Sequence, residues 1–398
     1  MTAAAPCAPR SEVRAAQIHT GAFYVAMFAV MGAHLPFWPV WLEDWGLTPG
    51  EVGFYTTMGV ATRVVAGLGF PVLADRLDQR RLVLVGLCLL AAAVFAAQAG
   101  IETKGLLLLA TLVNGAALSG VLPLGEALGA GAARSYGFAY APVRSTGSVS
   151  FLVTNVLLGL LIAPLGADVV LWWIVGCSLM AAVLGRRHPG GGTLRGHKPP
   201  ALSEIGRMLM QPTFLLFTIG ISLSLSSHAV YYVYGSVHWR ALGISDGTIG
   251  ALWAFSVAVE IGIMLFLAPF ALRHLGAIGM MALSGAGGIL RWGAMMIDPG
   301  TGWLWVLQIT HSLTFVAGHL GAIAFVQAAV PERYGASAQG AFLGLGGGVM
   351  TAVGMGLASV VYPVAGGLTY GIAVAMSAAG LVLILRLRSR WQGQELDV

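Results

Sequence analysis

Twelve long apolar runs dominate the sequence. Each supplies the roughly 20 apolar residues that a membrane-spanning helix needs. The chain is 57% hydrophobic and only 9% charged, whereas soluble chains average about 25% charged residues. The sequence therefore predicts an all-α integral membrane protein with twelve transmembrane helices. The predicted spans are 19–42, 51–74, 82–100, 105–128, 143–163, 168–185, 213–238, 247–270, 277–297, 303–329, 338–362 and 365–386.

Lysine and arginine residues predict the orientation of these spans. With a cytoplasmic N-terminus, the outer segments hold only Lys104 and Arg240, and Arg63, Arg144 and Arg291 lie inside apolar runs. Cytoplasmic loops carry an excess of Lys and Arg, so we predict a multi-pass protein of the cell inner membrane, embedded in the lipid bilayer, with both termini cytoplasmic. The cytoplasmic group is Arg10, Arg14, Arg76, Arg80, Arg81, Arg134, Arg186, Arg187, Arg195, Lys198, Arg207, Arg273, Arg333, Arg386, Arg388 and Arg390.

The two halves of the chain repeat. The segment GLTPGEVG, which starts at Gly46, matches GISDGTIG, which starts at Gly243, with three glycines at the same spacing. Two further pairs recur at an offset of 198, Pro71 with Pro269 and Tyr136 with Tyr334. Because six spans separate the copies, both have the same orientation and form parallel repeats. Thr48, and either Ser245 or Asp246, are candidate N-caps of the helix after each segment.

A polar segment rich in Gly and Pro separates the repeats and predicts a linker. The predicted organisation is an N-terminal six-helix bundle over 1–185, a cytoplasmic linker over 186–211 and a C-terminal six-helix bundle over 212–398.

Twelve spans in two parallel halves resemble the layout of the major facilitator superfamily (MFS). The loop PVLADRLDQRR, residues 71–81, is similar to that superfamily's signature between helices two and three. The chain has Pro71 and Asp78 where the family has, or often has, Gly. The resemblance implies a gating role in which Asp75 caps or pairs with a neighbouring helix end, whereas positive-inside charge alone explains only the arginines. The positions that fit are Asp75, Arg76, Arg80 and Arg81.

A closer resemblance is to the 3-phenylpropionate permease-like branch, related to lactose permease-type oligosaccharide:proton symporters. It runs along nearly the whole chain and implies secondary transport by alternating access. The matching positions are Leu35 to Trp38, Arg63 to Arg76, Tyr140 to Arg144, Gly147, Arg291, Trp292, Gln308, His311, Thr314, Phe315 and His319.

Ionisable residues inside the apolar runs are the candidate functional groups, because such residues are costly in hydrocarbon and mark functional sites. Glu126 ends the fourth run and Arg144 begins the fifth. The alternative is that both lie near the interface and extend to water. The full set is Arg63, Glu126, Arg144, Glu260 and Arg291, with His34, His228, His311 and His319.

The lactose permease-type resemblance implies roles for several of these residues. Substrate binding falls to Glu126, Arg144 and Arg291, and proton coupling to Glu260, His311 and Glu126. The family's proton-carrying Glu is Thr314 here, and the position three before His311 is the neutral Gln308, so another group must carry the proton. Phe37, Trp38 and Gln308 are further candidates to line the substrate site. His34 and His228 are expected to be structural, and for His311 both roles remain open.

Arg63 and Glu260 occupy equivalent positions in the two repeats, at an offset of 197. Their opposite charges suggest an ion pair between the halves. Two alternatives are that Arg291 pairs with Glu260, or that the pair only holds the halves together.

The sequence contains no metal-ligand motif, no nucleophile–base motif and no basic nucleic-acid-binding stripe. We predict no metal, no cofactor, no nucleic-acid partner and no enzymatic activity. The expected function is proton-coupled import of a small organic solute, with an aromatic carboxylate first, by a monomer. A sugar or nucleoside symporter and a proton-driven efflux pump are the alternatives.

Overall fold

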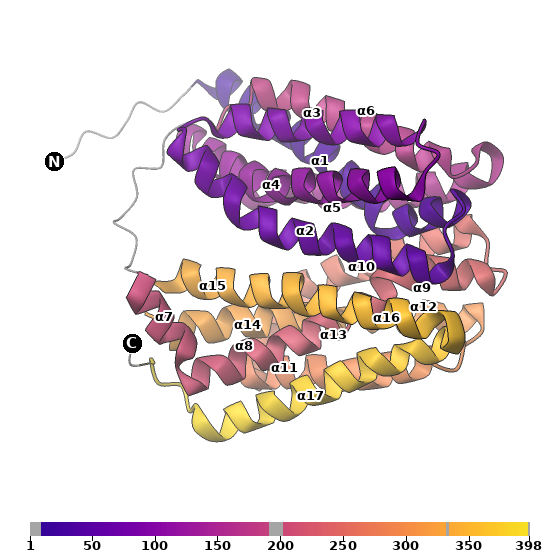
Figure 1. Cartoon of the computed structure of the whole chain (residues 1–398). Helices are drawn as coiled ribbons and strands as arrows, with labels where there is room; N and C mark the ends of the chain where they lie inside the picture. Colours follow the sequence, from indigo (N-terminus) through magenta and orange to yellow (C-terminus); the bar gives the residue numbers. More distant parts are fainter. Residues whose placement is uncertain (1–8, 191–201, 332–333, 397–398) are drawn as a thin grey trace. The chain divides into compact units, whose positions relative to one another are not determined.

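The computed structural model describes residues 9–190, 202–331 and 334–396, and in these ranges every regular element is a helix (Figure 1). The first half contains α1 (Arg10–Asp44), α2 (Pro49–Arg76), α3 (Arg80–Gln98), α4 (Lys104–Tyr136), α5 (Tyr140–Leu165) and α6 (Asp168–Arg186). The second half contains α7 (Leu202–Met210), α8 (Pro212–Ser226), α9 (Ala229–Ala241), α10 (Asp246–Phe266), α11 (Ala268–Met295), α12 (Thr301–Ile309), α13 (His311–Thr314), α14 (Val316–Ala329), α15 (Gly335–Leu343), a π-helix (Gly344–Met350), α16 (Thr351–Ala365), a 3-10 helix (Gly366–Thr369) and α17 (Tyr370–Arg390).

These helices account for twelve membrane spans. Nine helical stretches of the described residues are long and apolar enough to cross a membrane. The last stretch, Ser337–Arg390, has 54 residues and turns at Gly366, so it forms two spans. Helices α2 and α11 have 28 residues each and complete the twelve, although Arg63 and Arg291 lower their apolar character.

The chain divides into two compact units. Unit 1 comprises Met1–Asp44 and Ala61–Gly196, and unit 2 comprises Trp45–Val60 and His197–Val398. The first turns of α2 therefore group with the second half of the sequence. The predicted linker, 186–211, contains α7, and its residues 191–201 lie outside the described ranges.

Small residues bring the helices of unit 1 close together, as is usual in membranes. Helix α1 packs along α5 and α6, and α3 packs along α4 and α6 (Figure 1). At Gly32 a Cβ would lie 3.0 Å from the Phe151 carbonyl oxygen, so the backbones of α1 and α5 are in contact there. The Ser150 hydroxyl of α5 donates to the Val25 carbonyl of α1 at 2.7 Å. This close approach fixes the register of the two helices that hold Tyr24 and Arg144.

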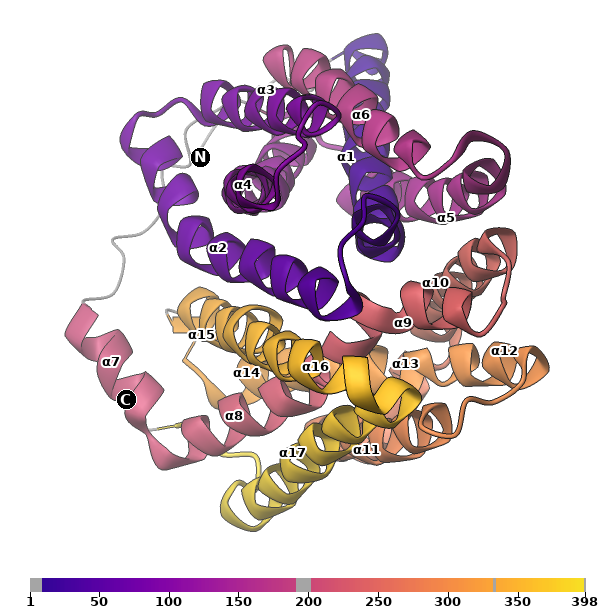
Figure 2. The same ribbon diagram turned by 45° about the vertical axis from the view of Figure 1, so that its right-hand side comes forward.

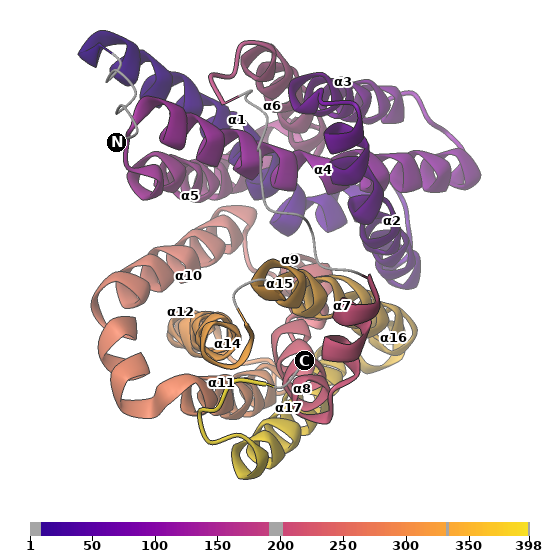
Figure 3. The same cartoon turned by 90° about the vertical axis from the view of Figure 1, so that its left-hand side faces the viewer.

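In unit 2, α17 lies between α8 and α11, as Figures 2 and 3 show. Helix α14 packs on α11, and α12 packs on α10. At the centre of one buried cluster, Phe217 of α8 stacks on Phe325 of α14 with ring centroids 4.3 Å apart.

Three spans that the sequence predicts as single helices are interrupted in unit 2. Span 213–238 breaks at Ser227–His228, and span 303–329 breaks at Thr310 and Phe315. Span 338–362 widens into the π-helix, where Ser226 and Thr351 both donate hydroxyl hydrogen bonds to the Gly346 carbonyl, at 2.5 and 2.8 Å. Side chains that insert into the backbone hydrogen-bond ladder are one cause of local departures from a regular α-helix.

The repeated loops adopt the same turn in both halves. Gly46 and Gly243 have positive φ angles of 108° and 81°, which suit glycine. The Thr48 hydroxyl accepts from the Glu51 amide at 3.4 Å, and the Ser245 hydroxyl accepts from the Thr248 amide at 3.3 Å. Ser245, rather than Asp246, is therefore the cap of α10. Asp246 instead binds Arg240 at 2.9 Å.

Candidate functional site

The structure brings Glu126 and Arg144 together in unit 1. The Arg144 Nε lies 2.5 Å from the Glu126 Oε1, which joins α5 to α4. The Tyr140 hydroxyl donates to the Glu126 Oε2, and the Tyr24 hydroxyl of α1 lies 3.3 Å from the same oxygen. One carboxylate therefore connects three helices. Both charged side chains remain about 30% exposed, at 28% and 31%, so they are accessible to a ligand.

Aromatic rings support the guanidinium of Arg144. Its carbon lies 4.1 Å from the centre of the Phe28 ring and 5.4 Å from that of Tyr24. Cations over aromatic faces are stabilised by the ring quadrupole. The absence of a side chain at Gly129 makes room for Tyr24, because a Cβ there would lie 2.2 Å from the Tyr24 hydroxyl. We define the Glu126 cluster as Tyr24, Phe28, Glu126, Tyr140 and Arg144.

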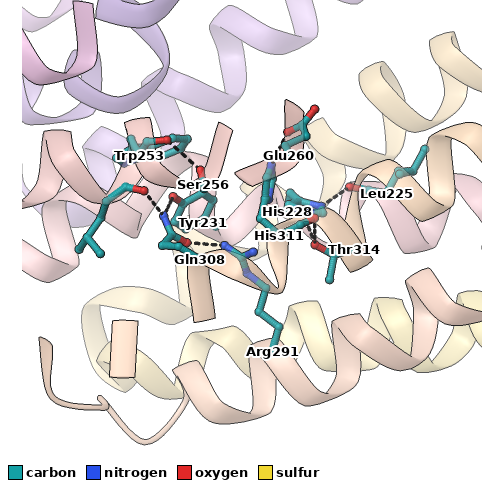
Figure 4. Close-up of polar contacts among 11 residues, drawn as sticks. Leu225, His228, Tyr231, Trp253, Ser256, Glu260, Arg291, Gln308, His311 and Thr314 are labelled. Carbon is teal, nitrogen blue, oxygen red and sulfur yellow. Dashed lines mark hydrogen bonds and ion pairs between the residues drawn. The ribbon is translucent and has the colours of Figure 1, made fainter. Parts of the chain in front are cut away.

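A second polar cluster lies inside unit 2 around Arg291 (Figure 4). Arg291 of α11 is fully buried, and one of its Nη atoms donates to the Gln308 Oε1 at 2.7 Å. The Gln308 amide in turn donates to the Tyr231 hydroxyl and the Leu252 carbonyl, both at 2.9 Å. Arg291 also stacks over Tyr231 and Trp292, with 5.4 and 4.8 Å to the ring centres. Gln308 therefore fixes the position of the arginine.

Glu260 pairs with His311 rather than with Arg291. The Glu260 Oε2 of α10 lies 3.4 Å from the His311 Nε2 of α13. No ion pair between Glu260 and Arg291 exists among the described residues, so the alternative pairing of these two is not observed. The Nε and one Nη of Arg291 and the Nδ1 of His311 are buried without a hydrogen-bond partner in the part of the chain that the structure describes. The cluster therefore retains unused hydrogen-bonding capacity.

His228 completes this cluster, and it is fully buried and hydrogen-bonded, which fits the structural role expected from the sequence. Its ring lies 5.2 Å from that of His311. Its Nδ1 lies 2.9 Å from the Leu225 carbonyl, and its Nε2 lies 3.0 Å from the Thr314 hydroxyl (Figure 4). The same hydroxyl donates to the His311 carbonyl at 2.9 Å.

The hydrogen bonds of His228 depend on its tautomer. A neutral imidazole has one donor and one acceptor nitrogen, so a ring protonated on Nδ1 donates to the Leu225 carbonyl and accepts at Nε2 from the Thr314 hydroxyl. The single hydroxyl proton of Thr314 is donated either to His228 or to the His311 carbonyl. We define the His311 cluster as His228, Glu260, Arg291, Gln308 and His311.

The other predicted site residues lie elsewhere in unit 1. Phe37 and Trp38 are buried in the bundle, where Trp38 stacks on Trp41 at 4.5 Å and meets Phe95 edge-on at 4.9 Å. They are placed as core residues, and a role in lining the substrate site stays a prediction. His34 stacks on Trp38 at 5.8 Å.

The gating residues are only partly described. The side chain of Asp75 lies outside the described residues, so its pairing stays a prediction. Arg76 is exposed at the end of α2, and Arg80 and Arg81 begin α3 and are half-buried. Arg63 belongs to unit 1 and Glu260 to unit 2, and their ion pair also stays a prediction.

In the described ranges, no group of three or more His, Cys, Asp or Glu side chains is placed to hold a metal ion. Cys88 and Cys177 are buried free thiols.

Sequence comparison identifies relatives over most of the chain. The model of the MFS_1 like family matches residues 18–372. The probable 3-phenylpropionic acid transporter of Escherichia coli (strain K12) is 30% identical over 311 residues, which cover 77% of this chain and 80% of the relative. The maltose permease of Geobacillus stearothermophilus is 26% identical over 346 residues, which cover 82% and 83% of the two chains.

Structural comparison gives the same fold. The nucleoside transporter NupG, solved as a mutant, aligns with a TM-score of 0.80 at 16% identity, over 95% of this chain and all of that chain. A bacterial homologue of the human lysosomal transporter Spinster aligns with a TM-score of 0.66 at 12% identity, over 96% of each chain.

Proposed function

Because the chain belongs to the MFS_1 like family, we propose that it imports a small aromatic carboxylate of the 3-phenylpropionate type together with protons. Its relatives and fold are those of membrane transporters, which are not enzymes. In this proposal the protein works as a monomer in the cell inner membrane. The bundles 1–185 and 212–398 rock alternately to expose the substrate to each side.

The proposal of proton coupling rests on the contact between Glu260 and His311. Without a bound proton, the negative charge of Glu260 is offset by the buried guanidinium of Arg291 in the same cluster. With one proton, the cluster has a net positive charge. Uncompensated charge in a low-dielectric interior costs several kcal/mol, on the order of 3–5 when one partner of a buried pair is lost. A bound proton therefore favours binding of an anionic substrate that offsets this charge, and His228 offers the proton a second position.

The Glu126 cluster supports the choice of a carboxylate substrate. A substrate carboxylate and the Glu126 carboxylate compete for the same guanidinium of Arg144, which suits bidentate carboxylate binding. Protonation of Glu126 weakens the ion pair between Glu126 and Arg144, so the Arg144 guanidinium becomes free to bind the substrate. Substrate and proton then favour each other's binding, and this coupling is reciprocal by thermodynamic linkage. The rings of Tyr24 and Phe28 provide contacts for the apolar end of the substrate.

Reconstituted vesicles test this function. With an inside-alkaline pH gradient, labelled 3-phenylpropionate is expected to accumulate, and a protonophore is expected to stop the accumulation. Substrate added without an imposed gradient is expected to raise the external pH, measured with a pH electrode. Uptake that ignores the protonophore would exclude proton coupling, and the absence of 3-phenylpropionate uptake would exclude the substrate class.

Import of a sugar is the second candidate. A carboxylate and an arginine beside aromatic faces also suit sugar hydroxyls and a sugar ring, and the maltose permease relative supports this reading. Labelled maltose in the same vesicles separates the two candidates, because each one predicts accumulation of its own substrate only.

A further inference from the structure

Unit 1 contains a partly open cavity of about 190 Å³ between α1, α2, α3, α4 and α6. Its walls are mainly apolar, and Arg63 and His34 are its ionisable nitrogen-containing side chains. We call it the Arg63 cavity. It is separate from the His311 cluster, which lies in unit 2, and none of the residues of the Glu126 cluster lines it.

Arg63 differs from the two arginines that the sequence assigns to substrate binding. Arg144 is bound to Glu126 at 2.5 Å, and Arg291 to Gln308 at 2.7 Å. The Nε of Arg63 has no hydrogen-bond partner among the described residues, and none of the ion pairs found among them involves this side chain. A cation in an apolar cavity without a counter-charge is costly. An anionic ligand would supply the missing charge without displacing an internal partner.

The remaining walls indicate what kind of anion fits. Met27, Met31 and Cys88 place sulfur atoms along the cavity, and thioethers make favourable contacts with aromatic rings. Only two hydroxyl groups, those of Ser119 and Ser178, line it. A sugar needs many hydrogen-bond partners when it is buried, so these walls suit an aromatic ring better. The volume is below the roughly 300–1,000 Å³ of pockets for drug-sized ligands, so a single-ring molecule fits better than a disaccharide.

The cavity also lies next to the Glu126 cluster along two helices. Met27 follows Tyr24 by three residues on α1, and Glu126 follows the cavity-lining Pro123 by three residues on α4. Residues three apart on a helix are neighbours, about 5–6 Å between Cβ atoms. We propose that the Arg63 cavity is a binding subsite for a single-ring aromatic carboxylate, in which Arg63 binds the carboxylate before Arg144 is released by Glu126. This inference rests on the proposed function.

Binding to the purified full chain tests the subsite. The probes are 3-phenylpropionate and its uncharged analogue 3-phenylpropionamide. Arg63→Gln is expected to weaken 3-phenylpropionate binding at least about tenfold, the effect of losing a hydrogen bond to a charged group, and to leave amide binding nearly unchanged. Arg63→Lys is expected to recover part of the preference for the acid. Arg134→Gln, at the exposed end of α4, is the matched control for loss of one positive charge.

The two buried thiols give a second readout. Cys88 lines the Arg63 cavity, whereas Cys177 lines a larger apolar groove formed by α1, α5 and α6. Saturating 3-phenylpropionate is expected to slow modification of Cys88 by methyl methanethiosulfonate at least threefold, and to leave that of Cys177 unchanged, as measured by peptide mass spectrometry. The protection is expected to disappear in Arg63→Gln.

The outcomes separate this inference from the proposed function. If the parent protein transports 3-phenylpropionate but Arg63→Gln keeps the acid-over-amide preference, the subsite is wrong and the function stands. If Glu260→Gln reproduces the loss of preference seen in Arg63→Gln, Arg63 acts through an ion pair with Glu260 and the subsite is again wrong. If the parent neither binds nor transports the acid, the proposed function fails first.

Discussion

Glu126 is the residue where proton binding and substrate binding would be coupled most directly. It accepts hydrogen bonds from Tyr140 and Tyr24 and an ion-pair contact from Arg144. In the proposed function, removing the negative charge of Glu126 breaks its ion pair with Arg144, and this links the chemistry of one side chain to the binding of a ligand.

Glu126→Gln is expected to separate binding from coupling. The amide mimics the protonated acid, so Arg144 is free and 3-phenylpropionate binds at least as tightly as in the parent. Accumulation against a gradient is expected to fall more than tenfold, because the proton site is lost. Equilibrium binding and vesicle uptake, measured on the same preparation, check both expectations. Tyr140→Phe, which removes one donor worth about 1 kcal/mol, is the milder control, and a Glu126→Gln protein that still accumulates substrate would contradict the role of this residue.

His228 and His311 give a second prediction at the residue scale. Replacing either by Gln removes a group that holds or receives the proton, so proton-driven accumulation is expected to fall at least tenfold while exchange of substrate across the membrane without a gradient persists. Counterflow and gradient-driven uptake, compared in the same vesicles, check this. His274→Gln, an exposed residue of α11, is the control. Normal accumulation in His228→Gln would restrict proton coupling to Glu260, His311 and Glu126.

Helices α1 and α5 carry Tyr24, Phe28, Tyr140 and Arg144 of the Glu126 cluster. Gly147 lies one turn after Arg144, and a Cβ there would lie 2.6 Å from the Phe28 ring that supports the guanidinium. The packing of the two helices and the position of the arginine therefore depend on the same glycine.

Gly147→Ala is expected to displace Phe28. Overpacking of this kind costs typically about 1–3 kcal/mol, so the thermal midpoint of the purified protein is expected to fall and substrate affinity to weaken with it. Gly86→Ala is the matched control, because a Cβ at this exposed position of α3 meets no atom within 4 Å. Alanine is the better helix former there, so Gly86→Ala is expected to leave stability unchanged or slightly raised. Equal effects of the two substitutions would contradict the packing argument.

At the scale of the whole molecule, the charge distribution predicts the topology. Reporter fusions check it: green fluorescent protein after Arg390 is expected to fluoresce, and alkaline phosphatase inserted near Gly300 is expected to be active, because that segment is predicted to lie outside. An inactive phosphatase near Gly300, together with a fluorescent C-terminal fusion, would contradict the predicted number of spans before Gly300.

The sequence predicts the fold well because the fold depends on the average apolarity along the chain, and hydropathy measures this quantity directly. It does not predict the breaks at Ser227–His228 and Thr310, because apolar residues continue on both sides. At these breaks the side chains of Ser227, His228 and Thr310 contact the carbonyl oxygens three residues earlier in the chain. The resemblance to lactose permease-type symporters assigns both Glu260 and His311 to proton coupling, but their pairing is not predicted, because the sequence offers Arg63 and Arg291 as partners of Glu260. Tyr24 is absent from the predicted site residues because its partner Glu126 lies far away in the sequence, and Thr314, which departs from the family pattern, contacts His228.

The interrupted spans of unit 2 have a mechanical consequence. An unbroken helix is stiff because each turn is held to the next by backbone hydrogen bonds, whereas a break or a widened turn bends at low cost. In the described residues, the His311 cluster lies beside the breaks at Ser227–His228 and Thr310. The helices that hold the Glu126 cluster are continuous, although α1 contains Pro36 and Pro39 and α4 contains Pro123, and each proline removes one backbone hydrogen bond. The segments around the His311 cluster therefore have two points at which they bend at low cost. In the proposed function, a proton taken up there would change local helix geometry without disturbing the packing of α1 against α5.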